Sequence, residues 1–180
     1  MNYYQQQAIV ARVGENDNLL GQVEKWEAHK QGLLHRGFTV ILQYKSSYLL
    51  QRRKHPVFDD YLDLSFSSHP VYINGKLQLM LEAIYQALKR EWGLVKKDLV
   101  DKPVFKGKFI YKAFDKKSGF TEHEVDHIYL VGINKLPKLN LDFAYEYFLM
   151  SKYELLGVEM QEDKVLAPWA LEIIKRGLLD

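Results

Sequence analysis

The sequence predicts an α+β fold in which a mixed β-sheet is flanked by helices. Two observations lead to this class. Short runs rich in β-branched and aromatic residues occur both before and after one long amphipathic segment, and two further helical segments lie near the end of the chain. The regular alternation of strand and helix that favours a parallel, doubly wound sheet is not found. We expect residues 1–180 to form one domain, because no repeat or linker divides them.

Three strands are predicted before the long helix, at 7–13, 37–44 and 48–52. Each run is rich in residues that favour strands, and polar or turn-forming residues bound it. The last two runs are separated by Lys-Ser-Ser at 45–47, which favours a hairpin turn.

The long helix is predicted over 77–92, LQLMLEAIYQALKREW. Apolar side chains recur along it at the spacing that places them on one helix face, namely Leu77, Leu81, Ile84 and Leu88. Gly93 follows directly, and glycine commonly ends helices because it adopts left-handed backbone angles without strain.

The second half of the chain is expected to add three strands and two helices. Strands are predicted at 104–113 and 122–133, joined by the turn DKKSGF, and at 145–150. Helices are predicted at 152–160 and after Pro168, since proline suits the first turn of a helix.

The strand that follows Gly119 carries carboxylates at alternate positions. Successive strand side chains point to opposite faces, so Glu122, Glu124 and Asp126 should share one face, and His123 and His127 the other. Like charges this close repel one another unless water, a cation or a shared proton compensates them. The residues are therefore consistent either with a solvated edge strand or with a metal or acid–base site.

Composition limits the possible classes of function. The chain has 25 basic and 23 acidic residues spread along its length, which is not typical of a protein that binds nucleic acid. It has no cysteine, so disulfides, thiolate metal sites and cysteine nucleophiles are excluded, and any metal ion must have nitrogen and oxygen ligands. No window approaches the ~20 apolar residues of a membrane span, so we expect a cytoplasmic protein.

Two further patterns are ambiguous from the residues alone. His29 and His35 are six residues apart, which is not the four-residue spacing of a zinc-binding helix. Glu91 ends the long helix, and could be a surface residue paired with Lys89 or Arg90. It could equally present its carboxylate to a magnesium ion bound to a diphosphate.

Several segments resemble type 1 isopentenyl-diphosphate isomerase, a member of the Nudix superfamily. They are EKWEAHKQGLLHRGF at 24–38, SSHP at 67–70, REWGL at 90–94, EHEVDHIYLV at 122–131 and APWALEII at 167–174. Their order and approximate spacing match that family over residues 18–174. The resemblance implies a Nudix-type α/β/α sandwich. It also implies an enzyme that interconverts isopentenyl diphosphate and dimethylallyl diphosphate by protonation and deprotonation through a carbocation.

Carried over position by position, the resemblance implies one divalent metal ion, which could be manganese, magnesium or zinc. Its ligands would be three histidines and two glutamates: His29, His35, His69, Glu122 and Glu124. Glu91 would help to hold a second magnesium ion on the substrate diphosphate. Lys25, Arg52 and Arg53 match basic positions that face this diphosphate, so a small isoprenoid diphosphate is the expected partner.

The resemblance also assigns the groups that move protons. Glu124, next to Tyr111, would be one of them, and Trp169 matches a tryptophan whose π face can stabilise a carbocation. Ser67 stands where the family has a catalytic cysteine, and a hydroxyl is far less acidic than a thiol. Ser67 could relay a proton less efficiently, the chain could catalyse a different step, or isomerase activity could be lost.

Two alternatives to the isomerase follow from the same segments. A Nudix hydrolase of a small diphosphate compound needs several glutamates on one helix, and only Glu91 fits that pattern. A catalytically weakened module that binds an isoprenoid diphosphate is the other alternative, since Gln86 and Ala87 stand where the isomerase family tends to carry arginines.

Overall fold

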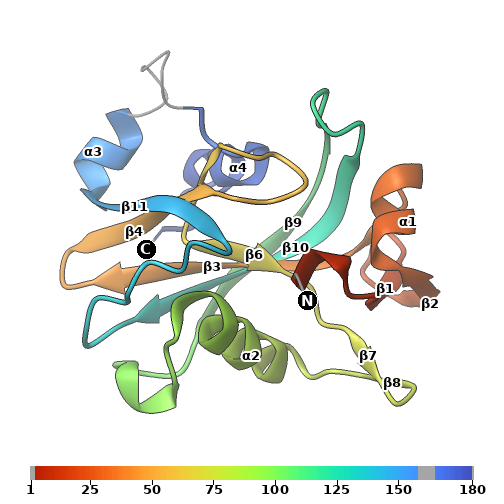
Figure 1. Ribbon diagram of the computed structural model, residues 1–180, viewed down its shortest axis with the longest axis horizontal. Coiled ribbons are helices and arrows are strands. Elements are labelled where there is room, and N and C mark those ends of the chain that lie inside the picture. The colour runs from red at the N-terminus through yellow and green to blue at the C-terminus, as the bar shows by residue number, and fades with distance from the viewer. Residues whose placement is uncertain (1–2, 158–164, 180) are drawn as a thin grey trace.

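A computed structural model describes residues 3–157 and 165–179 of the chain (Figure 1). Most of its strands form one nine-stranded mixed sheet. The main path of this sheet runs in the spatial order β11 (Ala144–Ser151), β4 (Ser47–Arg53), β3 (His35–Tyr44), β1 (Ile9–Val13) and β2 (Leu19–Glu24).

Four more strands attach to this path. The strand β10 (Thr121–Gly132) pairs with β3 in parallel, and β9 (Val104–Phe114) pairs with β10 in the antiparallel sense. The short strands β5 (Leu62–Asp63) and β6 (Phe66–Ser68) pair with β4 and β3. A separate hairpin consists of β7 (Tyr72–Ile73) and β8 (Lys76–Leu77).

Helices cover both faces of the sheet. In Figure 1, α2 (Met80–Trp92) lies below the sheet, whereas α3 (Lys152–Gly157) and α4 (Pro168–Lys175) lie above it. The helix α1 (Lys25–Gln31) lies at one end, and short 3-10 turns occupy Tyr3–Gln5 and Lys96–Asp98. The predicted α+β architecture, with a mixed sheet between helical layers, is confirmed.

The central strand β3 contributes to the core on both of its faces. Phe38, Val40 and Leu42 pack with α2, whereas Ile41 packs in the cluster that contains Trp169 of α4. Because strand side chains alternate, residues 35, 37 and 39 belong to the same face as Ile41. The α4 side of the sheet therefore has an apolar part and, towards the start of β3, a part that carries polar side chains.

The long helix begins later than its apolar pattern predicts. Leu77 belongs to β8, and the backbone of Leu79 is still extended before the helix begins at Met80. Leu81 is 38% exposed, and the buried face is formed by Ala83, Ile84, Ala87, Leu88 and Trp92. A hairpin of two-residue strands contains too few residues to show a strand period. The apolar pattern therefore assigns Leu77, its last residue, to the helix.

Two elements near the start of the chain were not predicted. The strand β2 is largely exposed and lacks the apolar alternation of a half-buried strand. The helix α1 has only seven residues, which is too short for a clear helical period. Its ends do carry recognisable signals, because the Glu24 side chain accepts a hydrogen bond from the backbone of Glu27, and Gly32 ends the helix with a φ of 61°. The helix predicted at 152–160 is observed over Lys152–Gly157, and its last part lies outside the described residues.

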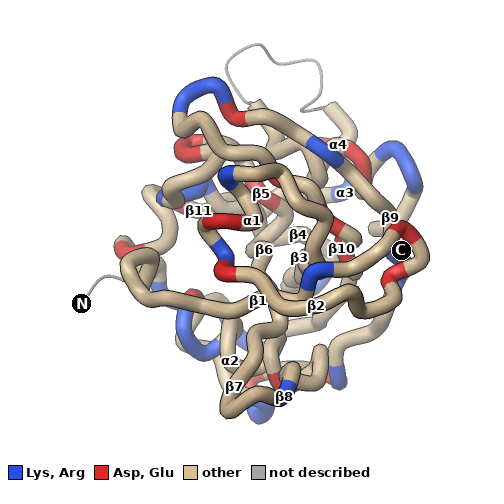
Figure 2. Tube along the Cα trace, turned by 90° about the vertical axis from the view of Figure 1, so that its right-hand side faces the viewer, with Lys and Arg blue, Asp and Glu red and all other residues tan. Residues whose placement is uncertain are grey.

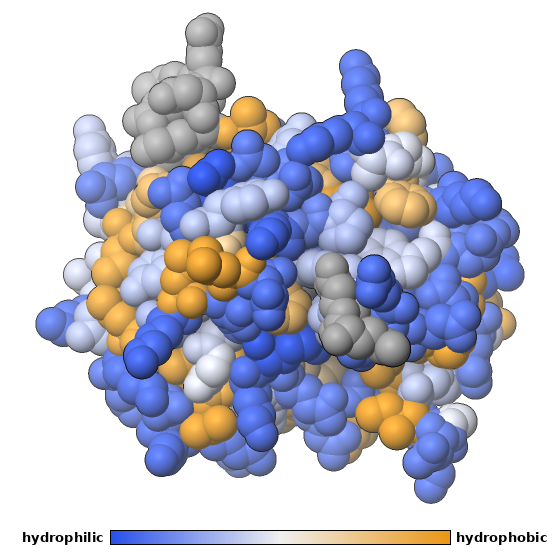
Figure 3. Space-filling view, in the orientation of Figure 1, coloured by the Kyte–Doolittle hydropathy of each residue, from blue (hydrophilic) through white to orange (hydrophobic). Residues whose placement is uncertain are grey.

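Charged residues of both signs occur along the chain. Basic and acidic residues are interspersed in Figure 2, and hydrophobic side chains on the face in Figure 3 lie in separate patches between hydrophilic ones. Among the described residues, no helix combines the length and apolar character that a membrane span requires.

Packing of α2 against the sheet can be tested with two equivalent leucines. Leu88 is 1% exposed in the core, whereas Leu81 lies on the same helix at 38% exposure. Replacement of Leu88 by Ala should lower the free energy of unfolding by about 2–5 kcal/mol, because it leaves a cavity. Leu81→Ala should cost less than about 1 kcal/mol. Equal costs in chemical denaturation would contradict this assignment of the helix face.

Candidate metal centre and adjoining cavities

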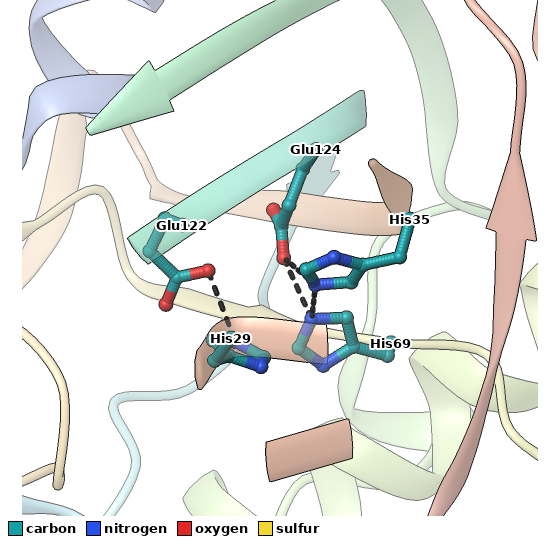
Figure 4. Close-up of side chains that lie close together, drawn as sticks. All are labelled: His29, His35, His69, Glu122 and Glu124. Atoms are coloured by element: carbon teal, nitrogen blue, oxygen red, sulfur yellow. Dashed lines mark hydrogen bonds and ion pairs between the residues drawn. The ribbon is translucent and has the colours of Figure 1, made fainter. Parts of the chain in front are cut away.

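Five histidine and glutamate side chains from four segments converge at one end of the sheet. Figure 4 shows them pointing toward one another, with one ligand atom of each lying within 4.8 Å of those of the others. They are His29 of α1, His35 of β3, His69 in the loop after β6, and Glu122 and Glu124 of β10. The parallel register of β3 and β10 places Glu124 directly beside His35.

The histidine rings are oriented by backbone carbonyls. The Nδ1 atom of His29 lies 2.6 Å from the carbonyl oxygen of Lys25, and the Nδ1 atom of His35 lies 2.8 Å from that of Leu33. A carbonyl oxygen can only accept a hydrogen bond, so Nδ1 carries the hydrogen in both rings. The Nε2 atoms therefore point into the cluster, in the tautomer that presents a lone pair to a metal ion.

The atoms at the centre of the cluster are mutual acceptors. His69 Nε2 lies 2.6 Å from Glu124 Oε1 and 3.2 Å from His35 Nε2. Glu122 Oε2 lies 3.1 Å from His29 Nε2 and has no other polar partner. Buried acceptors that face one another need a proton or a cation between them. A donor set of three nitrogens and two carboxylates fits a divalent ion such as manganese, zinc or magnesium.

Without a metal ion, a proton on His29 supplies part of this compensation. Burial disfavours the charged ring, but the Glu122 carboxylate, together with the Lys25 carbonyl and Glu124, outweighs burial and raises the pKa of His29 to about 9. Burial lowers the pKa of His69 to about 4, which keeps that ring neutral at pH 7. One histidine of the cluster is thus charged and another neutral in the metal-free protein.

The position of Glu124 depends on two neighbouring strands. The Tyr111 hydroxyl, directly opposite on β9, donates a hydrogen bond of 3.0 Å to Glu124 Oε2. On the other side, Gly37 of β3 leaves the space that the carboxylate occupies, since a Cβ atom there would lie only 2.3 Å from Glu124 Oε2. A side chain at position 37 and the observed position of Glu124 are therefore incompatible.

The three carboxylates of β10 share one buried face, as the alternation predicts. His123 and His127 lie on the opposite face, where their Nδ1 atoms contact the carbonyl oxygens of Gly32 and Gly37. Asp126 lies beyond the cluster and is completely buried. The interpretation of this segment as a solvated edge strand is wrong, because β10 pairs on both sides, with β3 and β9.

The hydroxyl of Ser67, on β6, lies among other polar groups. Ser67 Oγ is 2.9 Å from Thr39 Oγ1 and 3.2 Å from Asp63 Oδ2. Thr39 Oγ1 is also 2.9 Å from Asp126 Oδ2. In that contact the Thr39 hydroxyl donates to the Asp126 carboxyl, and burial raises the pKa of Asp126 well above its usual range.

Two adjoining cavities meet at Ser67. The inner cavity is lined by Tyr111, Glu122, Glu124 and Trp169, and the outer one by Lys25, Arg90 and Glu91, while Arg53, Ser67 and His69 line both. Trp169 is almost completely buried, and the guanidinium carbon of Arg53 lies 4.8 Å from the centre of its ring. Burial lowers the pKa of Lys25 to about 8, and this ammonium group lies 4.0 Å from the centre of the Trp26 ring.

Arg52 and Glu91, both predicted to lie near the diphosphate, have different surroundings. Arg52 is half-exposed and forms ion pairs with Asp60 and Glu146, on the other side of β4 from Arg53. Glu91 is only 7% exposed, so its interpretation as an ordinary surface residue is wrong. It does pair with Arg90, at 2.6 Å, and burial raises its pKa.

Two residues at these cavities, Arg90 and Asp63, were not predicted as site residues from the sequence. Arg90 donates hydrogen bonds to both Ser68 and Glu91, and it lines the outer cavity from the last turn of α2. Asp63 is completely buried and contacts Ser67, Arg53 and Trp169. The apolar neighbours of Asp63, Leu62 and Leu64, were a signal that this carboxylate is buried and needs partners.

The chain is similar to curated proteins named isopentenyl-diphosphate delta-isomerase. A protein of this name from Aromatoleum aromaticum is 30% identical over 170 residues, which cover 93% of this chain and 85% of the relative. One from Photorhabdus laumondii is 28% identical over 92% of this chain and 90% of the relative. Human isopentenyl-diphosphate delta-isomerase 2 is 29% identical over 92% and 80%, respectively. A scan of protein-family models found no match.

Solved structures share the fold. A Deinococcus radiodurans protein has a TM-score of 0.68 at 16% identity, covering 93% of this chain and 98% of its own. A MutT protein from Methanosarcina mazei has a TM-score of 0.55 at 14% identity, over 82% and 96%. A MutT Nudix hydrolase from Burkholderia pseudomallei has a TM-score of 0.54 at 14% identity, over 79% and 96%. These likenesses show that the fold is of the Nudix type.

Binding of a divalent ion at the five-residue cluster should release a proton. His29, with a pKa of about 9, is protonated at pH 7, whereas a metal-bound imidazole has lost that proton. The apparent affinity for Mn²⁺ should therefore rise by roughly tenfold per pH unit from pH 7 towards pH 9. Calorimetric titration in two buffers of different ionisation enthalpy counts the released proton. Glu122→Gln should reduce both affinity and proton release, whereas His123→Ala should change neither; a pH-independent affinity would contradict the assignment.

The space at Gly37 gives a second test of the same centre. Gly37→Ala should displace the Glu124 carboxylate and lower Mn²⁺ affinity by about tenfold or more, because one ligand is lost. Gly157→Ala is the matched control, since a Cβ atom there meets nothing within 4 Å. Elemental analysis and titration would measure the effect, and an unchanged affinity in the Gly37 variant would contradict the dependence of metal binding on the space at position 37.

Proposed function

This chain belongs to the isopentenyl-diphosphate delta-isomerase family, and on that premise we propose that it interconverts isopentenyl diphosphate and dimethylallyl diphosphate. One observation carries the proposal. Ser67 and Glu124, which come from different strands, line one inner cavity together with Tyr111 and Trp169. A shift of a proton from one carbon to another requires two proton-transfer groups around a single substrate, in a pocket that excludes water.

The two cavities offer different chemistry to the two ends of this substrate. Lys25, Arg53 and Arg90 bring positive charge to the outer cavity, which suits a diphosphate. The inner cavity contains aromatic rings and the carboxylate of Glu124, which suits a short hydrocarbon that reacts at its carbon atoms. We therefore assign the diphosphate to the outer cavity and the isoprenoid group to the inner one.

The proposed reaction begins with protonation of the alkene at its terminal carbon, which gives a tertiary carbocation. A proton then leaves the neighbouring methylene carbon, and its C–H electron pair forms the new double bond. Glu124, held by the Tyr111 hydroxyl, moves one of these protons, and Ser67 moves the other. The face of the Trp169 ring stabilises the positive charge between the two steps.

The five-residue cluster supports this chemistry through Glu124. His29, His35, His69, Glu122 and Glu124 would hold one divalent ion, whose charge fixes the Glu124 carboxylate and favours its proton transfer. Glu91 would help to hold a second ion, magnesium, on the diphosphate in the outer cavity. Arg90, which pairs with Glu91, would then be free to contact the diphosphate as well.

Hydrolysis of a diphosphate bond is less well supported. The helix α2 contains two glutamates, and the first of them, Glu82, is exposed. Ala83 and Gln86, which precede Glu91 on α2, line a neighbouring cavity that Lys25, His69 and Arg90 also line, and neither carries a carboxylate. Glu91 is thus the single carboxylate that this helix brings to the outer cavity, whereas hydrolysis by this superfamily uses several magnesium-binding glutamates.

The proposal predicts exchange of hydrogen with solvent at carbon. Metal-loaded protein incubated with isopentenyl diphosphate in deuterated water should give deuterated dimethylallyl diphosphate, which NMR detects. Ser67→Cys should raise kcat by about tenfold or more, because a thiol is a better proton carrier than a hydroxyl. Release of phosphate would indicate a hydrolase. Diphosphate binding without turnover, in the wild type and in Ser67→Cys alike, would indicate a binding module.

A further inference from the structure

Asp63 is a buried carboxylate to which the proposed reaction gives no role. It ends β5 and has no exposed surface. Its two oxygens face three donors, because Arg53 Nη1 lies 2.7 Å from Oδ2, Trp169 Nε1 lies 2.8 Å from Oδ1, and Ser67 Oγ lies 3.2 Å from Oδ2. These three partners are among the residues that line the inner cavity.

The ion pair with Arg53 explains how Asp63 can be charged in the interior. A buried carboxylate is costly without a cation, and the nearly inaccessible guanidinium of Arg53 supplies one. The pair alone does not require the other two contacts. Trp169 comes from a distant segment and Ser67 from the next strand, and both direct a polar atom to this carboxylate.

The Asp63 carboxylate is an acceptor for the hydroxyl hydrogen of Ser67. A hydroxyl has one hydrogen, and Ser67 can give it to Asp63, 3.2 Å away, or to Thr39, 2.9 Å away; the arrangement that matters for proton transfer is the one with Asp63. In that arrangement the hydrogen is turned away from the inner cavity and a lone pair of Oγ remains for the substrate. A serine becomes an effective proton acceptor only when an adjacent base takes its hydrogen.

We propose that Asp63 is the positioning residue of Ser67, and that it takes the Ser67 hydroxyl proton when Ser67 removes a proton from the carbocation. This inference rests on the proposed isomerase function. The C–H bond of the substrate breaks, and its electron pair becomes the new carbon–carbon double bond. The released proton bonds to Ser67 Oγ while the hydroxyl proton passes to Asp63 Oδ2. The cation and the carboxylate thereby become a neutral alkene and a neutral acid, and the reverse reaction restores both charges.

The same carboxylate links this step to the stabilisation of the cation. Its Oδ1 atom fixes the Trp169 indole through Nε1, and the Arg53 guanidinium on Oδ2 also lies against the face of that ring. A displacement of Asp63 would therefore shift the proton carrier and the aromatic ring together. This predicts an effect on kcat that is larger than the effect on KM.

The test is a double-mutant cycle between position 63 and position 67. Asp63→Asn keeps the shape of the side chain but cannot hold a negative charge for the proton. It should lower kcat by roughly a hundredfold, with KM changed by less than about threefold. In the Ser67→Cys background the same change should cost less than about tenfold, since a thiol needs less help to lose its proton. A purely structural role would cost the same in both backgrounds.

Two further variants keep the test decisive. Asp63→Asn leaves Arg53 without its carboxylate, so if it fails to fold, Asp63→Glu replaces it in the cycle, because glutamate keeps the charge but displaces the carboxylate. Asp115→Asn is the control, a buried aspartate whose partners are the Ser118 hydroxyl and the backbone N–H groups of Phe58 and Lys117. It should leave kcat unchanged in both backgrounds.

The outcomes separate this inference from the proposed function. Activity in the wild type, together with equal losses for Asp63 variants in the serine and cysteine backgrounds, would overturn the role of Asp63 and leave the isomerase intact. Activity only in Ser67→Cys would likewise show that Asp63 does not make the serine competent. No turnover of isopentenyl diphosphate in either background would overturn the proposed function, and this inference with it.

Discussion

The parallel pairing of β3 with β10 is the constraint on which the rest of the site depends. It sets Glu124 beside His35, and the antiparallel pairing of β9 with the same strand sets Tyr111 beside Glu124. A shift of β10 by one residue against β3 would turn the carboxylates to the opposite face, and the same shift of β9 would turn Tyr111 away from Glu124. The other ligands come from a short helix and a loop, so they can converge only on a centre that the sheet has already fixed.

The α4 side of the sheet combines an apolar core with a set of buried charges. Two of these charges are matched by opposite charges in the pairs His29–Glu122 and Arg53–Asp63. Removal of one member would leave the other uncompensated in a region of low polarity, which is why such pairs are sensitive to substitution. The residues around the cavities thus include buried charges that would be unfavourable in the apolar core.

The sequence predicted those features that depend on local pattern. Alternation along β10 was sufficient to place Glu122 and Glu124 on one face, and the strong apolar period located most of α2. Short elements escaped prediction, since α1 and the β7–β8 hairpin show too little of a period. Asp63 was not predicted for another reason. Its importance comes from three partners that are close to it in space, and no pattern in the sequence marks these contacts. The convergence of the five histidines and glutamates came from the family resemblance, not from their spacing.

Gly37 shows that a ligand can depend on a residue that carries no side chain. The Glu124 carboxylate occupies the space beside the Cα atom of Gly37, where a Cβ atom would lie 2.3 Å from Oε2. In a chain that keeps all five residues of the cluster but has a larger residue at this position, the carboxylate must take another place. The residue at position 37 of the central strand therefore sets the placement of a ligand that it does not itself supply.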